Sequence, residues 1–88
     1  METRIAVITI IIEDRSVAGN VNAVLSEYAE YIIGRMGLPY RKRNINIITL
    51  ALDAPETKIS ALSGTLGNLE GVTTKTTFAP MTYNDEER

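Results

Sequence analysis

The sequence predicts a small α+β domain with the element order β-α-β-β-α-β. Runs of β-branched residues at 4–12 (RIAVITIII) and 45–52 (INIITLAL) are typical of buried strands. Two other segments place apolar residues at helical spacing, one after each of these strands. This order is typical of the ferredoxin-like fold, in which a four-stranded antiparallel sheet has two helices on one face.

The first strand, 4–12, ends at a polar cluster that begins with Glu13. Asp14 or Ser16 can then accept hydrogen bonds from the free N–H groups of a helix start. The helix is predicted from residue 17 to 27 or 28. Its apolar stripe consists of Val17, Val21, Val24, Leu25 and Tyr28.

A second strand is predicted over 31–36 (YIIGRM). Gly37, Leu38 and Pro39 follow it and are predicted to end regular structure. A polar segment, 40–44, leads to the strand over 45–52. In the ferredoxin-like arrangement the strands 4–12 and 45–52 occupy the centre of the sheet.

A helix over about 54–69 follows, because Asp53 and Glu56 have the spacing of a capping box. Pro55 suits its first turn, where a missing N–H costs nothing. Gly71 is placed to end the helix in a left-handed conformation. The predicted core stripe is Ile59, Leu62, Leu66 and Leu69.

The segment 72–78 (VTTKTTF) alternates between two faces, which indicates a strand with one solvated face. Lys75 suits an edge position there. We expect one domain over 1–78, followed by a loose C-terminal tail over 79–88 that contains Pro80.

The two central strands predict self-association. Neither strand alternates apolar with polar residues, so both faces of the sheet centre are apolar, although two helices cover one face. A second copy in a homodimer or homotetramer is the simplest cover for the other face, and the C-terminal tail is the alternative. Small residues on the second helix would allow a close approach. The candidate interface residues are Ile8, Ile10, Ile48, Leu50, Gly64 and Gly67.

The composition excludes several classes of function. The 88 residues contain no cysteine and no histidine, which removes thiolate metal sites and the commonest general base. We find no coherent catalytic group and expect no enzyme activity, no metal and no cofactor. Nine basic and eleven acidic residues argue against broad nucleic-acid binding. No apolar run is long enough to cross a membrane, so we expect a cytoplasmic protein.

The segment IIGRMGLPYRKRNINIITLAL, with SALSGTLGNLEGV further on, resembles the iron-only hydrogenase system regulator family. The likeness extends over about residues 4–78, and GRMGLPY, 34–40, is its most specific part. The family is described as ACT-like and as similar to the C-terminal domain of the nickel-responsive repressor. The resemblance implies a ferredoxin-like fold, assembly through the sheets and a regulatory role, but it implies no particular ligand. The repressor's nickel-binding histidines and cysteine have no counterpart here.

ACT domains commonly bind amino acids near the turn between the first strand and the first helix. The corresponding residues are Asp14, Arg15, Ser16, Gly19 and Asn20. A helix start and Arg15 would favour a small anionic or amino-acid ligand. A capped helix start with a solvated turn is the alternative explanation of the same residues.

A second candidate site is the basic cluster Arg35, Tyr40, Arg41, Lys42 and Arg43. It could contact an anion, a protein of hydrogenase maturation or nucleic acid, with Tyr40 as a stacking surface. The alternative is a solvated hairpin tip. The sequence therefore predicts a regulatory module that binds a small ligand or docks a partner. A structural subunit without a ligand and a weak nucleic-acid binder remain alternatives.

Overall fold

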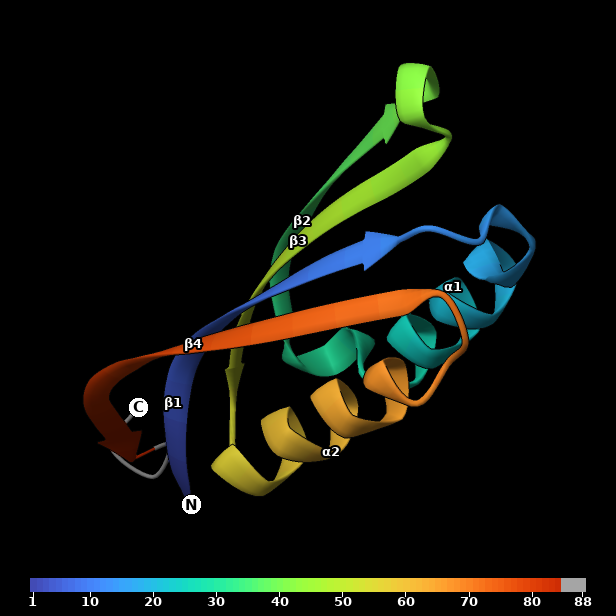
Figure 1. Ribbon diagram of the computed structural model, residues 1–88. Helices are drawn as coiled ribbons and strands as arrows, with labels where there is room; N and C mark the ends of the chain where they lie inside the picture. Colours follow the sequence, from blue (N-terminus) through green and yellow to red (C-terminus); the bar gives the residue numbers. More distant parts are fainter. Residues whose placement is uncertain (85–88) are drawn as a thin grey trace.

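The computed structural model describes residues 1–84, in which a four-stranded sheet lies over two helices (Figure 1). The strand order is β2-β3-β1-β4, and every neighbouring pair is antiparallel, as in the expected ferredoxin-like fold. The elements are β1 (Glu2–Ile12), α1 (Ala18–Glu27), β2 (Ile32–Tyr40), β3 (Ile45–Ala54), α2 (Glu56–Gly67) and β4 (Val72–Asn84). Short 3-10 turns, η1 (Arg15–Val17), η2 (Ala29–Tyr31) and η3 (Arg41–Arg43), join them.

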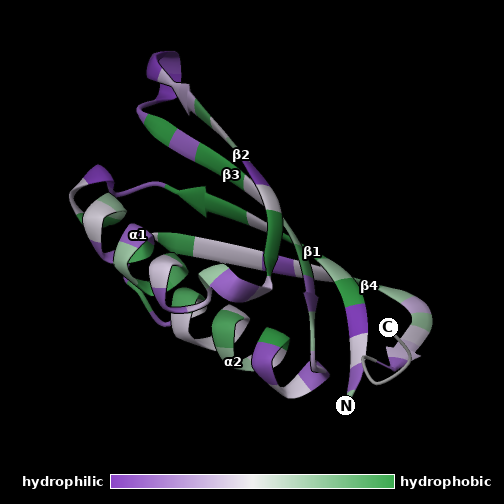
Figure 2. Cartoon of the chain, turned by 180° about the vertical axis from the view of Figure 1, so that it is seen from behind, coloured by the Kyte–Doolittle hydropathy of each residue, from purple (hydrophilic) through white to green (hydrophobic). Residues whose placement is uncertain are grey.

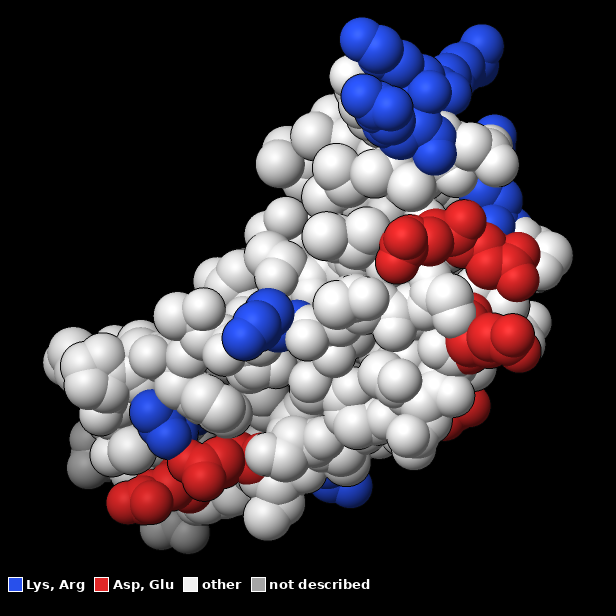
Figure 3. Space-filling view, in the orientation of Figure 1, with Lys and Arg blue, Asp and Glu red and all other residues white. Residues whose placement is uncertain are grey.

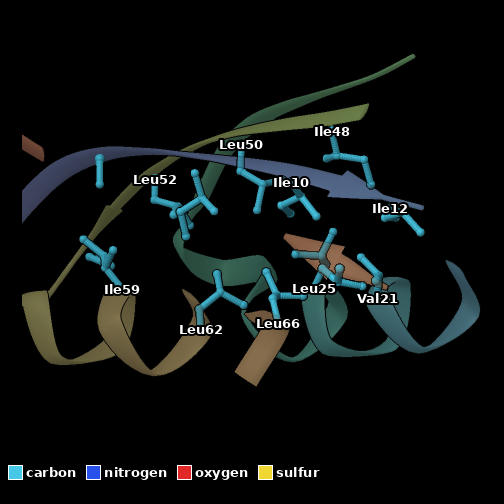
Figure 4. Packing of buried hydrophobic residues seen from close by; sticks show 14 residues of the cluster. Ile10, Ile12, Val21, Leu25, Ile48, Leu50, Leu52, Ile59, Leu62 and Leu66 are labelled. Carbon is cyan, nitrogen blue, oxygen red and sulfur yellow. The ribbon is translucent and has the colours of Figure 1, made fainter. Parts of the chain in front are cut away.

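The core lies between the sheet and the helices (Figure 4). Ile8, Ile10 and Leu50 are fully buried there, and Ile48 is 7% exposed. This burial corrects the sequence assignment of these four residues to an interface between copies. Alternate residues of a strand point to opposite faces of the sheet. The set that contains these four residues faces the chain's own helices.

Both helices bury the stripes that their spacing predicts. Val21 and Leu25 are buried on α1, and Ile59, Leu62 and Leu66 are buried on α2. The partly buried Val17, Val24, Tyr28 and Leu69 pack against the same core. Each large aliphatic side chain fully buried here contributes roughly 1.5–3 kcal/mol relative to exposure, so these stripes fix how the helices lie against the sheet.

Strand β2 continues through Gly37, Leu38 and Pro39 to Tyr40, so the predicted break in that segment is wrong. The reason is its place at the sheet edge. A proline cannot donate a ladder hydrogen bond, which an edge strand tolerates on its free side. Pro39 lies opposite Asn46 in the ladder with β3. The β2–β3 hairpin is consequently longer than the sequence suggests.

Strand β4 continues to Asn84, so the prediction of a loose tail from residue 79 is wrong for 79–84. The rest of the tail, 85–88, lies outside the described residues. An irregularity between Arg4 and Ala6 of β1 accommodates the proline in β4. Arg4 donates to the carbonyl oxygen of Ala79 at 2.8 Å, and its guanidinium lies 4.4 Å from the Phe78 ring centroid. Pro80 therefore sits at a bulge instead of ending the strand.

The predicted capping box is also wrong. Because β3 runs to Ala54, Asp53 is a strand residue of the parity that faces away from the helices. Pro55 occupies the N-cap position of α2, and no side chain caps it. Glu56 instead forms an ion pair with Arg4.

The face of the sheet opposite the helices, here called the outer face, carries mainly apolar side chains. The register aligns Ile11 with Ile47, Ile47 with Leu38, and Ile45 with Tyr40. The exposed fractions are 39% for Ile11, 58% for Met36, 53% for Leu38 and 46% for Tyr40. In Figure 2 the hairpin tip is hydrophilic, whereas the adjoining part of β3 and the end of β1 carry hydrophobic colour.

Gly71 has the predicted left-handed conformation, with φ of 75°, three residues beyond the α2 C-cap at Asn68. Its carbonyl oxygen accepts a 2.7 Å hydrogen bond from the Glu13 N–H. A Cβ atom at this position would lie 2.6 Å from the Asp14 Cβ. Close approach and positive φ both require glycine here.

We predict that Gly71→Ala lowers the free energy of unfolding by about 2–4 kcal/mol, since strain and steric overlap add. The matched change is Gly64→Ala in α2, where a Cβ would meet no atom within 4 Å. It should raise stability by up to about 1 kcal/mol through helix propensity. Urea denaturation measures both changes, and equal stability of the two variants would contradict the assignment.

Candidate functional site

A pocket of about 260 Å³ opens between α1 and the β2–β3 hairpin. The hairpin projects beyond the helices at one end of the molecule (Figure 1). At 1.5 Å per residue, the helices are only about 15 and 18 Å long, whereas the molecule is 46 Å long. The helices therefore leave part of the sheet uncovered, and the pocket lies at that step.

Apolar side chains form most of the pocket wall. Ile12 at the end of β1, Ile48 of β3 and Pro39 of β2 line it from the parity that faces the helices. Leu38 and Ile47 border it, although their strand parity is that of the outer face. Ala18 lines it from the first turn of α1. Gly37 adds no side chain, and a Cβ there would meet no atom within 4 Å. The glycine therefore leaves open space in the wall of the pocket.

Three polar side chains line the same pocket: Asn22 of α1, Arg35 of β2 and Asn46 of β3. Arg35 Nη2 donates to Asn22 Oδ1 at 3.0 Å. Within residues 1–84, no carboxylate forms an ion pair with Arg35. Asn46 Oδ1 is buried without a hydrogen-bond partner in the described part of the chain. An unpaired buried acceptor is costly, which makes it a natural position for a ligand donor.

The predicted ligand turn lies beside this pocket but is organised differently. Asp14 Oδ1 accepts hydrogen bonds from the Ser16 backbone N–H at 3.0 Å and from Ser16 Oγ at 2.6 Å. The hydroxyl bond, followed by the backbone bond, lowers the pKa of Asp14 below its ordinary value. Asp14 therefore caps the 3-10 turn η1, as in the alternative explanation of a capped, solvated turn, while no side chain caps α1 at Val17.

The other turn residues point to contacts with the hairpin or with solvent. Arg15 Nη1 donates to Asn44 Oδ1 at 3.3 Å, which links the turn to the hairpin tip. Gly19 and Asn20 are exposed on α1 and do not line the pocket. The predicted ligand turn thus lies at the same end of the domain as the pocket, but the pocket lining includes Ala18 and Asn22 in place of the predicted residues.

The predicted basic cluster divides into two parts. Arg41, Lys42 and Arg43 form η3 at the hairpin tip, and all three are exposed. Figure 3 shows basic side chains gathered over this tip, with acidic groups beginning below it. Tyr40 precedes the turn, while Arg35 lies further back along β2 and contacts α1.

Gly64 and Gly67, the remaining predicted interface residues, are exposed on α2. A Cβ at Gly67 would lie 3.4 Å from Thr74 Oγ1, so this glycine faces β4 of its own chain. Gly64 faces open space, and it remains available to a partner.

Sequence reasoning missed Asn22 and Asn46. A signal for Asn46 was present, because it is the single polar residue of the alternating set 46, 48, 50 and 52 that faces the helices. Asn22 gave no such signal, since polar residues on an amphipathic helix are common. Pairing between α1 and β2 is a tertiary contact that periodicity does not encode.

Among 1–84, no group of three or more His, Cys, Asp or Glu residues could hold a metal ion. No helix in the same range is long and apolar enough to span a membrane.

Residues 4–76 match the sequence profile of a family described as TM1266-like, iron-only hydrogenase system regulator. The chain belongs to this family. A solved structure of the uncharacterized protein TM1266 from Thermotoga maritima shares 42% identity and superimposes with a TM-score of 0.83. This match covers 86% of the present chain and 96% of TM1266. Every residue of the pocket lies within the matched range.

A second solved structure shares the fold alone. A formyltetrahydrofolate deformylase from Pseudomonas putida KT2440 has 15% identity and a TM-score of 0.62. The match covers 86% of the present chain and 29% of the deformylase. The ferredoxin-like, ACT-like fold is thus confirmed, without any transfer of the deformylase activity. A search of curated proteins returned no match.

The capped turn predicts a pH dependence. Because the pKa of Asp14 is lower in the folded chain, its carboxylate stabilises the fold above the unfolded value of about 3.9. This contribution is lost as the pH falls through the folded-state pKa. Ser16→Ala removes the hydroxyl bond and should raise the Asp14 pKa, measured by carboxyl carbon NMR. An unchanged Asp14 pKa in Ser16→Ala would show that the hydroxyl bond is not its cause.

Proposed function

We propose that the chain is a non-catalytic regulatory module of the iron-only hydrogenase system that acts in the cytoplasm as a homodimer or homotetramer. The family supports the regulatory part of this proposal. The observation that supports self-association is the apolar outer face of the sheet. No helix within residues 1–84 covers that face (Figure 1).

The exposed apolar side chains on the outer face are adjacent to one another. Met36, Leu38 and Tyr40 alternate along β2, and their register partners on β3 include Ile45 and Ile47. Contiguous apolar patches of this kind are rare on soluble monomers unless they form contacts. A standard stable interface buries about 800 Å² on each partner.

The charged residues of the outer face lie at its margins. Lys75 projects from the edge strand β4, opposite Thr9, and Asp53 lies near the end of β3. The central strands carry Val7 and Thr49 there, and Met36 lies beside Thr49 on β2; none of the three has a formal charge. An apolar centre with charged margins is the usual arrangement of an interface. A second copy of the same face therefore fits it.

We predict that Met36→Lys weakens self-association by about 30-fold or more, because it places a charge among the apolar side chains of a desolvated interface. The substitution should leave the fold intact, since Met36 is 58% exposed in the single chain. Ala23→Lys adds the same charge on the exposed side of α1 and is the matched control. Light scattering over a concentration series measures the mass.

Two results would contradict this account. One is a strictly monomeric wild-type chain, and the other is a Met36→Lys variant with the wild-type mass at every concentration. A loss of mass in both Met36→Lys and Ala23→Lys would assign the interface to net charge instead of to the outer face.

The exposed tip of the β2–β3 hairpin favours a second candidate function, contact with nucleic acid. Arg41, Lys42 and Arg43 form no ion pair with a carboxylate among residues 1–84. Tyr40 is 46% exposed next to them and offers a ring for base stacking. An oligomer would repeat this tip and strengthen a weak site by avidity.

This second function is tested with a single-stranded oligonucleotide in a gel-shift assay at low and moderate salt. Replacing Arg41, Lys42 and Arg43 by glutamine should weaken binding strongly at low salt, because phosphate contacts dominate such affinity. The slope of log K against log salt should decrease by about 2. Absence of oligonucleotide binding by the wild-type chain at low salt would exclude this second function.

A further inference from the structure

The geometry points to the pocket between α1 and the β2–β3 hairpin as a binding site for a small amphipathic carboxylate that carries a hydroxyl or amino group next to the carboxylate. Side chains of α1, β1, β2 and β3 of one chain line the pocket. It lies on the helix side of the sheet, whereas the proposed interface uses the outer face.

The anionic end of the ligand is assigned to Arg35. Its guanidinium is held by a 3.0 Å bond to Asn22 Oδ1, which uses one of five N–H donors. Since no carboxylate within residues 1–84 neutralises it, a ligand carboxylate would supply the missing charge in a bidentate contact. The first turn of α1, at Ala18, lines the same pocket and adds a favourable dipole.

Asn46 Oδ1 is assigned as the acceptor for a hydrogen-bond donor of the ligand. The buried Oδ1 atom of Asn46 has no hydrogen-bond partner among the described residues. An O–H or N–H group of the ligand would satisfy this acceptor and remove its desolvation cost. A ligand with a carboxylate alone would leave the acceptor unpaired, so this atom distinguishes hydroxy or amino acids from plain fatty acids.

The body of the ligand is assigned to the apolar wall. Ile12 and Ile48 line the pocket together with Pro39, and all three share the strand parity that faces the helices. The volume of about 260 Å³ lies below the range of drug-sized sites, which begins at roughly 300 Å³. A short branched aliphatic chain fits this space, and a nucleotide does not.

The probe is α-hydroxyisocaproate, which combines a carboxylate, a neighbouring hydroxyl and a branched aliphatic chain. Isocaproate lacks the hydroxyl, and α-hydroxyisocaproamide lacks the charge. Leucine replaces the hydroxyl by an ammonium group and tests which donor the site prefers. Titrations are followed by amide chemical shifts in the isotope-labelled, full-length protein, at its native oligomeric state.

We expect saturable shifts at Gly37, Asn46 and Ile48 with α-hydroxyisocaproate or leucine at millimolar concentration. Isocaproate and the amide should bind about tenfold more weakly or not at all, because each lacks one polar contact. Absence of saturable shifts with both α-hydroxyisocaproate and leucine would overturn the assignment. Equal binding of all four compounds would overturn it as well, since the polar groups would then play no part.

Matched variants separate the pocket from general surface charge. Arg35→Gln and Arg41→Gln remove the same charge from exposed arginines, but only Arg35 lines the pocket. Arg35→Gln should weaken binding about tenfold or more, whereas Arg41→Gln should leave it unchanged. Equal losses in both variants would assign binding to the basic end of the molecule in general.

Gly37→Val provides an independent test that keeps every charge. A β-branched side chain suits a strand, and the space beside Gly37 is open. The variant should fold, fill the pocket and lose binding. Retained wild-type binding by a folded Gly37→Val variant would overturn the proposal, while light scattering on the same samples reports self-association separately.

Discussion

The structure depends on the alternation of side chains in its two central strands. β1 and β3 each place one set of residues against the helices and the other on the opposite face. Ile8, Ile10 and Leu50 form the core because two amphipathic helices cover them. The same alternation puts Ile11 and Ile47 on the outer face. The sheet therefore cannot bury all its apolar residues within one chain.

The lengths of the elements explain the candidate site. The β2–β3 hairpin projects beyond the helices (Figure 1), and Asn46 and Ile48 line the pocket at this step. This step brings Arg35 to Asn22 and leaves Asn46 Oδ1 without a hydrogen-bond partner in residues 1–84. The pocket and the outer face lie on opposite sides of the same two strands. A ligand in the pocket could thus act on assembly through the β2–β3 hairpin that both share.

Local pattern was sufficient to predict strand and helix order, the helix stripes, the edge position of Lys75 and the conformation of Gly71. It failed where tertiary contacts override local signals. Pro39 and Pro80 suggested that their strands end. Pro39 is instead accommodated by its position in an edge strand, and Pro80 by a bulge that Arg4 supports. Asp53 has the spacing of a cap, but β3 continues past it. Core residues such as Ile8 and Leu50 were assigned to an interface because both faces of the central strands are apolar. The pocket depends on the Arg35–Asn22 contact, which connects elements that periodicity treats separately.

Small-angle X-ray scattering tests the central claim, that a second copy covers the outer face. The single chain has a Cα radius of gyration of 13.5 Å. The account predicts a larger value at micromolar concentration and above, which decreases toward that of the single chain on dilution. A radius that stays near 13.5 Å over the whole concentration range would contradict the account, because the outer face would then be stable in water.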